Sequence, residues 1–262
     1  MAIVSALSSG CGGAERPSAT TLGATTLSNV IRAPQDAIVA GAALVAEQLL
    51  NIDAASLTIG DYVFRNWGIA ALSGARSAAT GRMTEPSLSD DERLLARLVD
   101  PTAEFLDPTV EGAEPTTAVL AAALHCDQRP WDEAAFAAAR SIAEQGGYGA
   151  THAALAAGWL RELACSPAET ERFRVELVDE IAAELARATD VTDLSVEQSC
   201  VLFYLGAGER VASGWGDRVR AVQRADGGWG PTASNWHMTL LAVWTLSALD
   251  APGAGVAMAS PF

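Results

Sequence analysis

The apolar residues of this chain follow two alternating patterns from about residue 34 onward. In one pattern they recur every three or four residues and charged side chains fill the opposite face, as in a helix with one solvent-exposed side. In the other pattern apolar residues occupy nearly every position, which indicates a helix buried on all sides. The amphipathic segments are 34–51, 89–100, 131–145, 168–189 and 209–225. The apolar segments alternate with them at 60–75, 114–126, 148–163, 195–208 and 235–250.

Alternation of two helix types along the whole chain is typical of repeat architectures. A ring of amphipathic helices around an inner ring of apolar helices is an α/α toroid, and it buries the inner helices most completely. A two-layer solenoid, which would need polar end caps, and an irregular bundle are the alternatives. We therefore predict an all-α toroid of about ten helices over residues 34–262, preceded by a tether over residues 1–33.

Composition restricts the partners of such a domain. Half of the residues are hydrophobic, which is sufficient for a large core, and the net charge is −15. A strongly negative chain is repelled by nucleic acid and by anionic membrane surfaces, so neither is expected as a partner. No run of 18 uncharged apolar residues is present, and no membrane-spanning helix is expected.

The N-terminal segment resembles the end of a bacterial lipoprotein signal. An apolar stretch ends in small residues before Cys11, and Gly, Ser and Thr residues follow. This resemblance implies lipidation of Cys11 and an exported protein anchored at the periplasmic or outer-membrane face. An ordinary unstructured N-terminal extension is the alternative. The other cysteines, Cys126, Cys165 and Cys200, are odd in number and include no C-x-x-C pair, so we expect no disulfide framework.

A Gly-Gly-Trp-Gly turn precedes the last apolar segment. Gln223, Gly227 and Trp229 fit a Q-x3-G-x-W pattern, and residues 145–156 contain a weaker copy. The pattern is similar to the QW motif of squalene–hopene and oxidosqualene cyclases, and the turns resemble those of protein prenyltransferase β subunits. Glycine supplies a positive φ for the chain reversal, and the aromatic ring wedges between helices. The resemblance implies the toroid fold and an enzyme that acts on an isoprenoid-like, hydrophobic molecule.

The catalytic motifs of these families are incomplete in this sequence. The D-x-D-D acid motif of class II terpene cyclases is absent, and so is the D-x-C pair of the prenyltransferase zinc site. His237, however, opens an apolar segment shortly after a Gly-Gly-aromatic turn, where the resemblance places the zinc-binding histidine. The resemblance therefore implies a metal ligand at His237.

Alignment of the apolar segments on their cores predicts a polar cluster. It places His152, Cys200 and His237 at one level on three consecutive inner helices, where neighbouring axes are about 8–10 Å apart. Two imidazoles and a thiolate with one open position suit catalytic zinc, or copper as second choice, with Asp193 as a possible further ligand. A catalytic cluster of these residues without metal, and an ordinary buried core, are the alternatives.

Aromatic and polar residues of the apolar segments are candidates for binding a ligand. The residues expected to contact it are Asp61, Asn66, Trp67, Tyr148, Trp229 and Trp236. Carboxylates in first turns, Glu114 and Glu197 among them, are further candidates for acid–base chemistry. We expect an enzyme that acts on a hydrophobic small molecule with His152, Cys200 and His237 as catalytic residues. The alternatives are a non-catalytic ligand-binding lipoprotein and an accessory lipoprotein for protein contacts.

Overall fold

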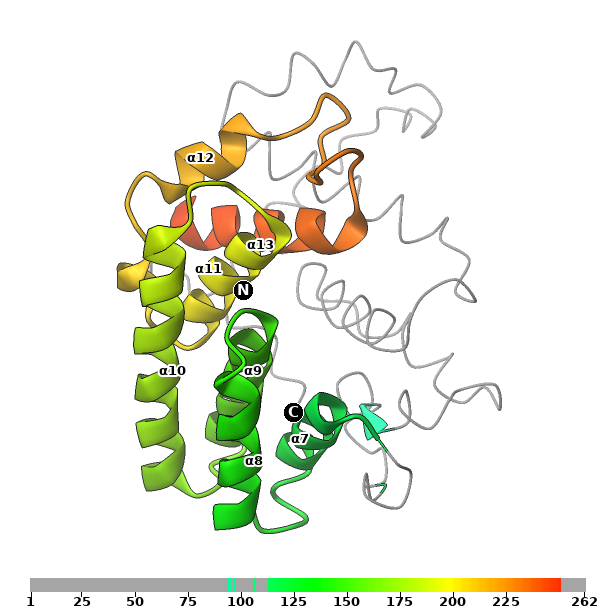
Figure 1. Cartoon of the computed structure of the whole chain (residues 1–262), viewed down its shortest axis with the longest axis vertical. Helices are drawn as coiled ribbons and strands as arrows, with labels where there is room; N and C mark the ends of the chain where they lie inside the picture. The colour runs from blue at the N-terminus through cyan, green and yellow to red at the C-terminus, as the bar shows by residue number, and fades with distance from the viewer. Residues whose placement is uncertain (1–93, 96, 98–105, 107–112, 251–262) are drawn as a thin grey trace, which may run out of the picture.

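The computed structural model describes residues 94–95, 97, 106 and 113–250 (Figure 1). In this part of the chain all regular secondary structure is helical and no strand occurs, which confirms the all-α class. The elements are α7 (Pro115–Leu124), α8 (Glu133–Ala143), α9 (Tyr148–Glu162), α10 (Pro167–Arg187), α11 (Asp193–Tyr204), the 3-10 helix η4 (Gly208–Arg210), α12 (Trp215–Ala221) and α13 (Trp236–Asp250).

The helices form an inner row and an outer row (Figure 1). In the inner row α7 packs on α9, α9 on α11, and α11 on α13. In the outer row α8 packs on α7 and α9, α10 on α9 and α11, and α12 on α13. The predicted alternation is therefore present within residues 113–250. The predicted tether 1–33, with Cys11, and the segments 34–51 and 60–75 lie outside the described residues, so closure into a ring stays a prediction.

Burial separates the two rows as the sequence pattern predicts. In α9 every residue from 150 to 160 is buried except His152, whereas α10 buries one stripe that includes Phe173, Leu177 and Ile181. Small residues allow the inner helices to approach closely. A Cβ atom at Gly158 of α9 would lie 2.1 Å from the ring of Tyr204 in α11, so only glycine fits there.

The segment 209–225 departs from its prediction. It forms η4 and the short helix α12 instead of one continuous amphipathic helix. Residues 211–214 separate the two, and Ser213-Gly214 there is a sequence that favours turns over helix. No helix within the described ranges is long and apolar enough to cross a membrane.

The Gly-Gly-Trp-Gly turn joins α12 to α13 and has a structural role. Gly227 adopts φ 90°, and Gln223 Nε2 donates to the Gly227 carbonyl at 2.7 Å. The fully buried Trp229 ring donates from Nε1 to the Val219 carbonyl of α12 at 2.7 Å. Its backbone N–H donates to Thr239 Oγ1 of α13 at 3.0 Å. Trp229 therefore connects the two helices, and its predicted contact with a ligand stays a prediction.

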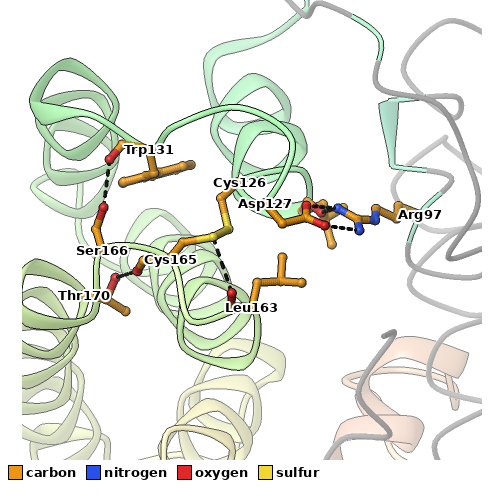
Figure 2. Close-up of a disulfide and its surroundings, with 9 residues drawn as sticks. Arg97, Cys126, Asp127, Trp131, Leu163, Cys165, Ser166 and Thr170 are labelled. Carbon is orange, nitrogen blue, oxygen red and sulfur yellow. Dashed lines mark hydrogen bonds and ion pairs between the residues drawn. A yellow bond between two sulfur atoms is a disulfide. The ribbon is translucent and has the colours of Figure 1, made fainter.

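A disulfide between Cys126 and Cys165 contradicts the prediction that no disulfide forms (Figure 2). Cys126 follows the C-terminal end of α7, and Cys165 follows the C-terminal end of α9. Because α7 and α9 are neighbours in the inner row, the two loops that leave them meet at the same end. Counting cysteines could not reveal this, because the pairing depends on which helix ends are adjacent. The bond closes a loop of 39 residues, worth about 4 kcal/mol in the chain-entropy estimate.

We expect Trp229→Ala to lower the free energy of unfolding by about 3–5 kcal/mol, because it leaves a cavity between α12 and α13 and removes a buried hydrogen bond. Trp229→Phe is the matched control. It keeps most of the ring and loses the Nε1–H donor, so it should cost about 1–3 kcal/mol, less than the alanine variant. Chemical denaturation measures both, and equal stability of the alanine variant and the wild type would contradict the structural role.

Candidate functional site

The N-terminal ends of three inner helices bring a set of polar side chains together. Asp193 and Glu197 lie one turn apart on α11, and His237 is the second residue of α13. Helix α9 contributes Tyr148, Thr151 and His152 in its first two turns. We call these six residues the polar cluster.

Local capping interactions fix the first turns that carry the cluster. The Ser195 N–H donates to Thr192 Oγ1 and the Thr192 N–H donates to Ser195 Oγ, a capping box that starts α11 at Asp193. Asn235 Oδ1 accepts from the Met238 N–H at 2.8 Å and so caps the start of α13. Gly147, with φ 53°, precedes α9 and turns the chain into it.

Asp193 orients the imidazole of His237. His237 Nδ1 lies 2.9 Å from Asp193 Oδ1 and 3.0 Å from Oδ2. Burial opposes ionisation of Asp193, but hydrogen bonds from His237 and Tyr148 and the His237 charge outweigh it, and the pKa of Asp193 is lowered. An ionised carboxylate only accepts hydrogen bonds, so Nδ1 of His237 carries the proton. In the neutral imidazole Nε2 is then the unprotonated nitrogen, on the side of the ring away from Asp193.

Tyr148 of α9 contacts the pair formed by Asp193 and His237. Its hydroxyl donates to Asp193 Oδ2 at 2.8 Å, and its ring stacks on His152 with 6.5 Å between centroids. Burial, and then the hydrogen bond to Asp193, raise the pKa of Tyr148, so the hydroxyl stays protonated and remains a donor. Burial, and then the charge on His237, lower the pKa of His152 to about 4. His152 is therefore a neutral imidazole near His237 at physiological pH.

Glu197 is the deepest acid of the cluster, with 5% of its surface exposed. Burial raises its pKa to about 7, although the charge on His237 and a hydrogen bond with Thr151 act in the opposite direction. Thr151 Oγ1 lies within hydrogen-bond distance of the Tyr148 carbonyl and donates to Glu197 Oε1. This donation favours the ionised carboxyl, and the effect of burial outweighs it.

Asp193, Glu197 and His237 can hold a metal ion. Each offers one ligand atom, and these atoms lie within 4.8 Å of one another. His237 Nε2 is 3.8 Å from Glu197 Oε2, too far for a hydrogen bond. Two ligands on one zinc ion, at about 2.0–2.1 Å each, are separated by about 3.3 Å at a tetrahedral angle and by at most about 4.1 Å. The separation of His237 and Glu197 falls within this range, whereas the group as a whole, whose ligand atoms lie within 4.8 Å of one another, would contract on binding an ion.

Only two of the four predicted metal ligands belong to the group of three residues that could hold an ion. Asp193 and His237 are brought together, whereas Cys200 and His152 lie outside the group of three. The Cys200 thiol is free and buried, and burial raises its pKa well above the ordinary value, so it resists forming the thiolate that a metal needs. Within the described residues, it is Glu197 and not Cys200 that accompanies Asp193 of α11 in the candidate metal group. Glu197 is the fifth residue of α11, as His152 is of α9, and Cys200 lies almost one turn deeper.

The predicted ligand contacts are only partly visible. Asp61, Asn66 and Trp67 lie outside the described residues, and so does the side chain of Trp236. Tyr148 is at the cluster and 45% exposed. Glu197 was predicted only as an acid or base, yet a signal for a ligand pair was present: Asp193 and Glu197 are spaced i, i+4 at the start of an otherwise apolar helix, and therefore share a face.

Comparisons with protein-family models, with curated proteins and with solved structures found no match for this chain. The interpretation of the cluster therefore depends on its own geometry.

We expect Glu197→Gln to stabilise the protein more at pH 8 than at pH 4.5. The folded-state pKa of Glu197 is raised to about 7, so its contribution to stability is fully present below the unfolded value of about 4.5 and is lost as the pH rises through 7. Glutamine avoids the cost of ionisation, and its side-chain carbonyl can still accept from Thr151 Oγ1. The gain at pH 8 should be on the order of 3 kcal/mol.

Denaturation of both proteins at the two pH values measures this gain. Glu133→Gln, at an exposed position of α8, is the control, and it should change the free energy of unfolding by the same amount at both pH values. A pH-independent effect of Glu197→Gln would mean that the buried carboxyl does not titrate near neutrality.

Proposed function

We propose that this chain is a zinc-dependent enzyme whose metal is held by Asp193, Glu197 and His237. The observation that carries the proposal is the convergence of their ligand atoms within 4.8 Å on the capped first turns of two packed helices. Helix-borne ligands keep their geometry better than ligands on loops. The proposed substrate is a hydrophobic small molecule, as the resemblance to the cyclase and prenyltransferase toroids implies.

The donor set fits zinc. Zn²⁺ accepts imidazole nitrogen and carboxylate oxygen in one tetrahedral site, and catalytic zinc sites use three protein ligands and one open position. The sequence suggested copper as the second metal for a site that includes the thiol of Cys200. Because this thiol lies outside the group of three ligands, the argument for copper is weaker than that for zinc. A bound zinc ion would supply Lewis-acid chemistry, which polarises a carbonyl or phosphoryl oxygen of the substrate.

Other contacts within the cluster orient the ligands, and Asp193 takes part in them as well as offering a ligand atom. Asp193 holds Nδ1 of His237 and so directs Nε2 toward Glu197, an arrangement that fixes both tautomer and ring orientation in metal sites. Tyr148 holds Asp193 from the other side. The hydroxyl of Thr151 donates to Glu197. His152 lies near His237 and is neutral at physiological pH, so it adds no positive charge beside the metal site.

A metal-free acid–base enzyme is the second candidate function. The pKa of Asp193 is lowered and that of Glu197 is raised to about 7, although both lie on the same helix face. Carboxyl groups whose pKa values are driven apart by their surroundings are typical of catalytic acid–base pairs. In this candidate Glu197 is the acid, and the oriented imidazole of His237 is the base. A non-catalytic binding protein would require neither role.

We expect the purified full chain to bind about one zinc ion, as measured by elemental analysis and by titration calorimetry with Zn²⁺. Glu197→Ala and His237→Ala should each lower the affinity at least 100-fold, because each removes a ligand. Asp193→Asn should lower it at least 10-fold, because a neutral amide is a poorer zinc ligand than a carboxylate and can present its NH₂ group to Nδ1, which favours the wrong tautomer.

Cys200→Ala is the matched control, because it removes the ligand that the sequence predicted and should leave zinc affinity unchanged. Circular dichroism melts confirm that each variant is folded. A chain that binds no zinc but loses turnover in Glu197→Gln would favour the acid–base enzyme. Loss of zinc in Cys200→Ala alone would overturn the proposed ligand set.

A further inference from the structure

The Cys126–Cys165 disulfide lies at the C-terminal ends of α7 and α9, whereas the polar cluster lies at the N-terminal ends of the inner helices. Figure 2 shows the surroundings of the disulfide. Cys126 is 6% exposed and belongs to the hydrophobic core, and Cys165 is partly buried against that core. Thiol–disulfide exchange requires access of an attacking thiolate to a sulfur atom. The enclosed position therefore favours a permanent bond over a reversible switch.

The loop that carries Cys165 adopts an unfavourable backbone conformation. Ala164 and Ser166, on either side of the cysteine, have φ values of 54° and 42°. Residues with a Cβ atom rarely occupy this region, and they do so where the surrounding structure holds them. Here the loop is held on both sides: Ser166 Oγ donates to the Trp131 carbonyl at 3.1 Å, and Thr170 Oγ1 donates to the Cys165 carbonyl at 2.7 Å.

Arg97 holds the loop that carries Cys126 in place. Arg97 donates to the Asp127 carboxylate, beside Cys126, and to the Leu124 carbonyl at the end of α7 (Figure 2). The hydrogen bond from Arg97 lowers the pKa of Asp127. Burial acts in the opposite direction but is the smaller effect, so the pair stays ionised. Both loops that carry the disulfide are therefore fixed by contacts of their own. This is the setting of a structural crosslink.

We propose that Cys126–Cys165 is a permanent crosslink and that this chain therefore folds and acts in an oxidising compartment, outside the reducing cytoplasm. Buried structural disulfides form and persist in secreted and envelope proteins and are rare where glutathione and thioredoxin keep thiols reduced. This inference is independent of the zinc proposal, because it uses other residues at the opposite end of the helices. It places the substrate of the polar cluster in the cell envelope or outside the cell.

Formation of the bond needs an oxidant that such compartments supply. The two thiols lose two protons and two electrons, and a disulfide of a dithiol oxidase accepts them by thiol–disulfide exchange. The oxidase leaves as a dithiol, and the Cys126–Cys165 bond remains.

The test is a cysteine labelling experiment on the full chain with its own N-terminus, expressed in a bacterium and separated into cytoplasmic and envelope fractions. Denatured protein is alkylated before and after reduction, and the cysteine peptides are identified by mass spectrometry. We expect the protein in the envelope fraction, with Cys126 and Cys165 labelled only after reduction. Cys200 is the internal control and should be labelled without reduction.

A second measurement covers the structural claim. The double variant Cys126→Ser/Cys165→Ser should melt at a clearly lower temperature than the wild type, or fail to accumulate, whereas Cys200→Ser should change little. Chain that accumulates in the cytoplasm with both thiols reduced and an unchanged melting temperature would overturn the proposal. Rapid reduction of the bond in the folded protein by a mild dithiol would also overturn it, because it would indicate a redox switch.

Discussion

The burial of the inner helices over most of their length is the constraint on which the site depends. A polar side chain on a helix that is packed on all sides cannot find water, and an unpaired buried group destabilises the fold. The polar groups in the first turns of α9, α11 and α13 satisfy one another, although Asp193, His237 and Tyr148 also keep part of their surface exposed. Asp193, His237 and Tyr148 do so by hydrogen bonds across three helices, and Glu197 does so through Thr151. The same pairing brings their ligand atoms together.

The chemistry of the cluster follows from the unequal surroundings of its two carboxyl groups. Asp193 lies at the edge of α11 and receives hydrogen bonds from two donors, which favour its ionised form. Glu197 lies one turn deeper, where burial favours the neutral form. One carboxyl group can therefore orient an imidazole while the other holds a proton or, after losing it, a metal ion. Helix α9 connects this site to the disulfide, because its first turns carry Tyr148, Thr151 and His152 and its C-terminal end leads to Cys165.

The sequence predicted features that arise from local pattern. Alternation of apolar and amphipathic segments predicted the two rows of helices in the described part, and the Gly-Gly-Trp-Gly turn predicted the positive φ of Gly227 and the buried ring of Trp229. Position after that turn also singled out His237. Features that depend on register between helices were not predictable in this way. Alignment of the apolar cores singled out Cys200 on α11, whereas the candidate metal group of the structure includes Asp193 and Glu197 of that helix. The disulfide was missed for a related reason, since it depends on the adjacency of α7 and α9.

X-ray absorption spectroscopy of the zinc-loaded protein tests the central claim most directly, because sulfur and oxygen or nitrogen ligands differ in distance from the metal. The ligand set Asp193, Glu197 and His237 predicts a first shell of nitrogen and oxygen alone, at about 2.0–2.1 Å, with the outer-shell scattering of an imidazole. A sulfur scatterer at about 2.3 Å would contradict it, because it would place Cys200 on the metal and restore the register that the apolar segments predicted.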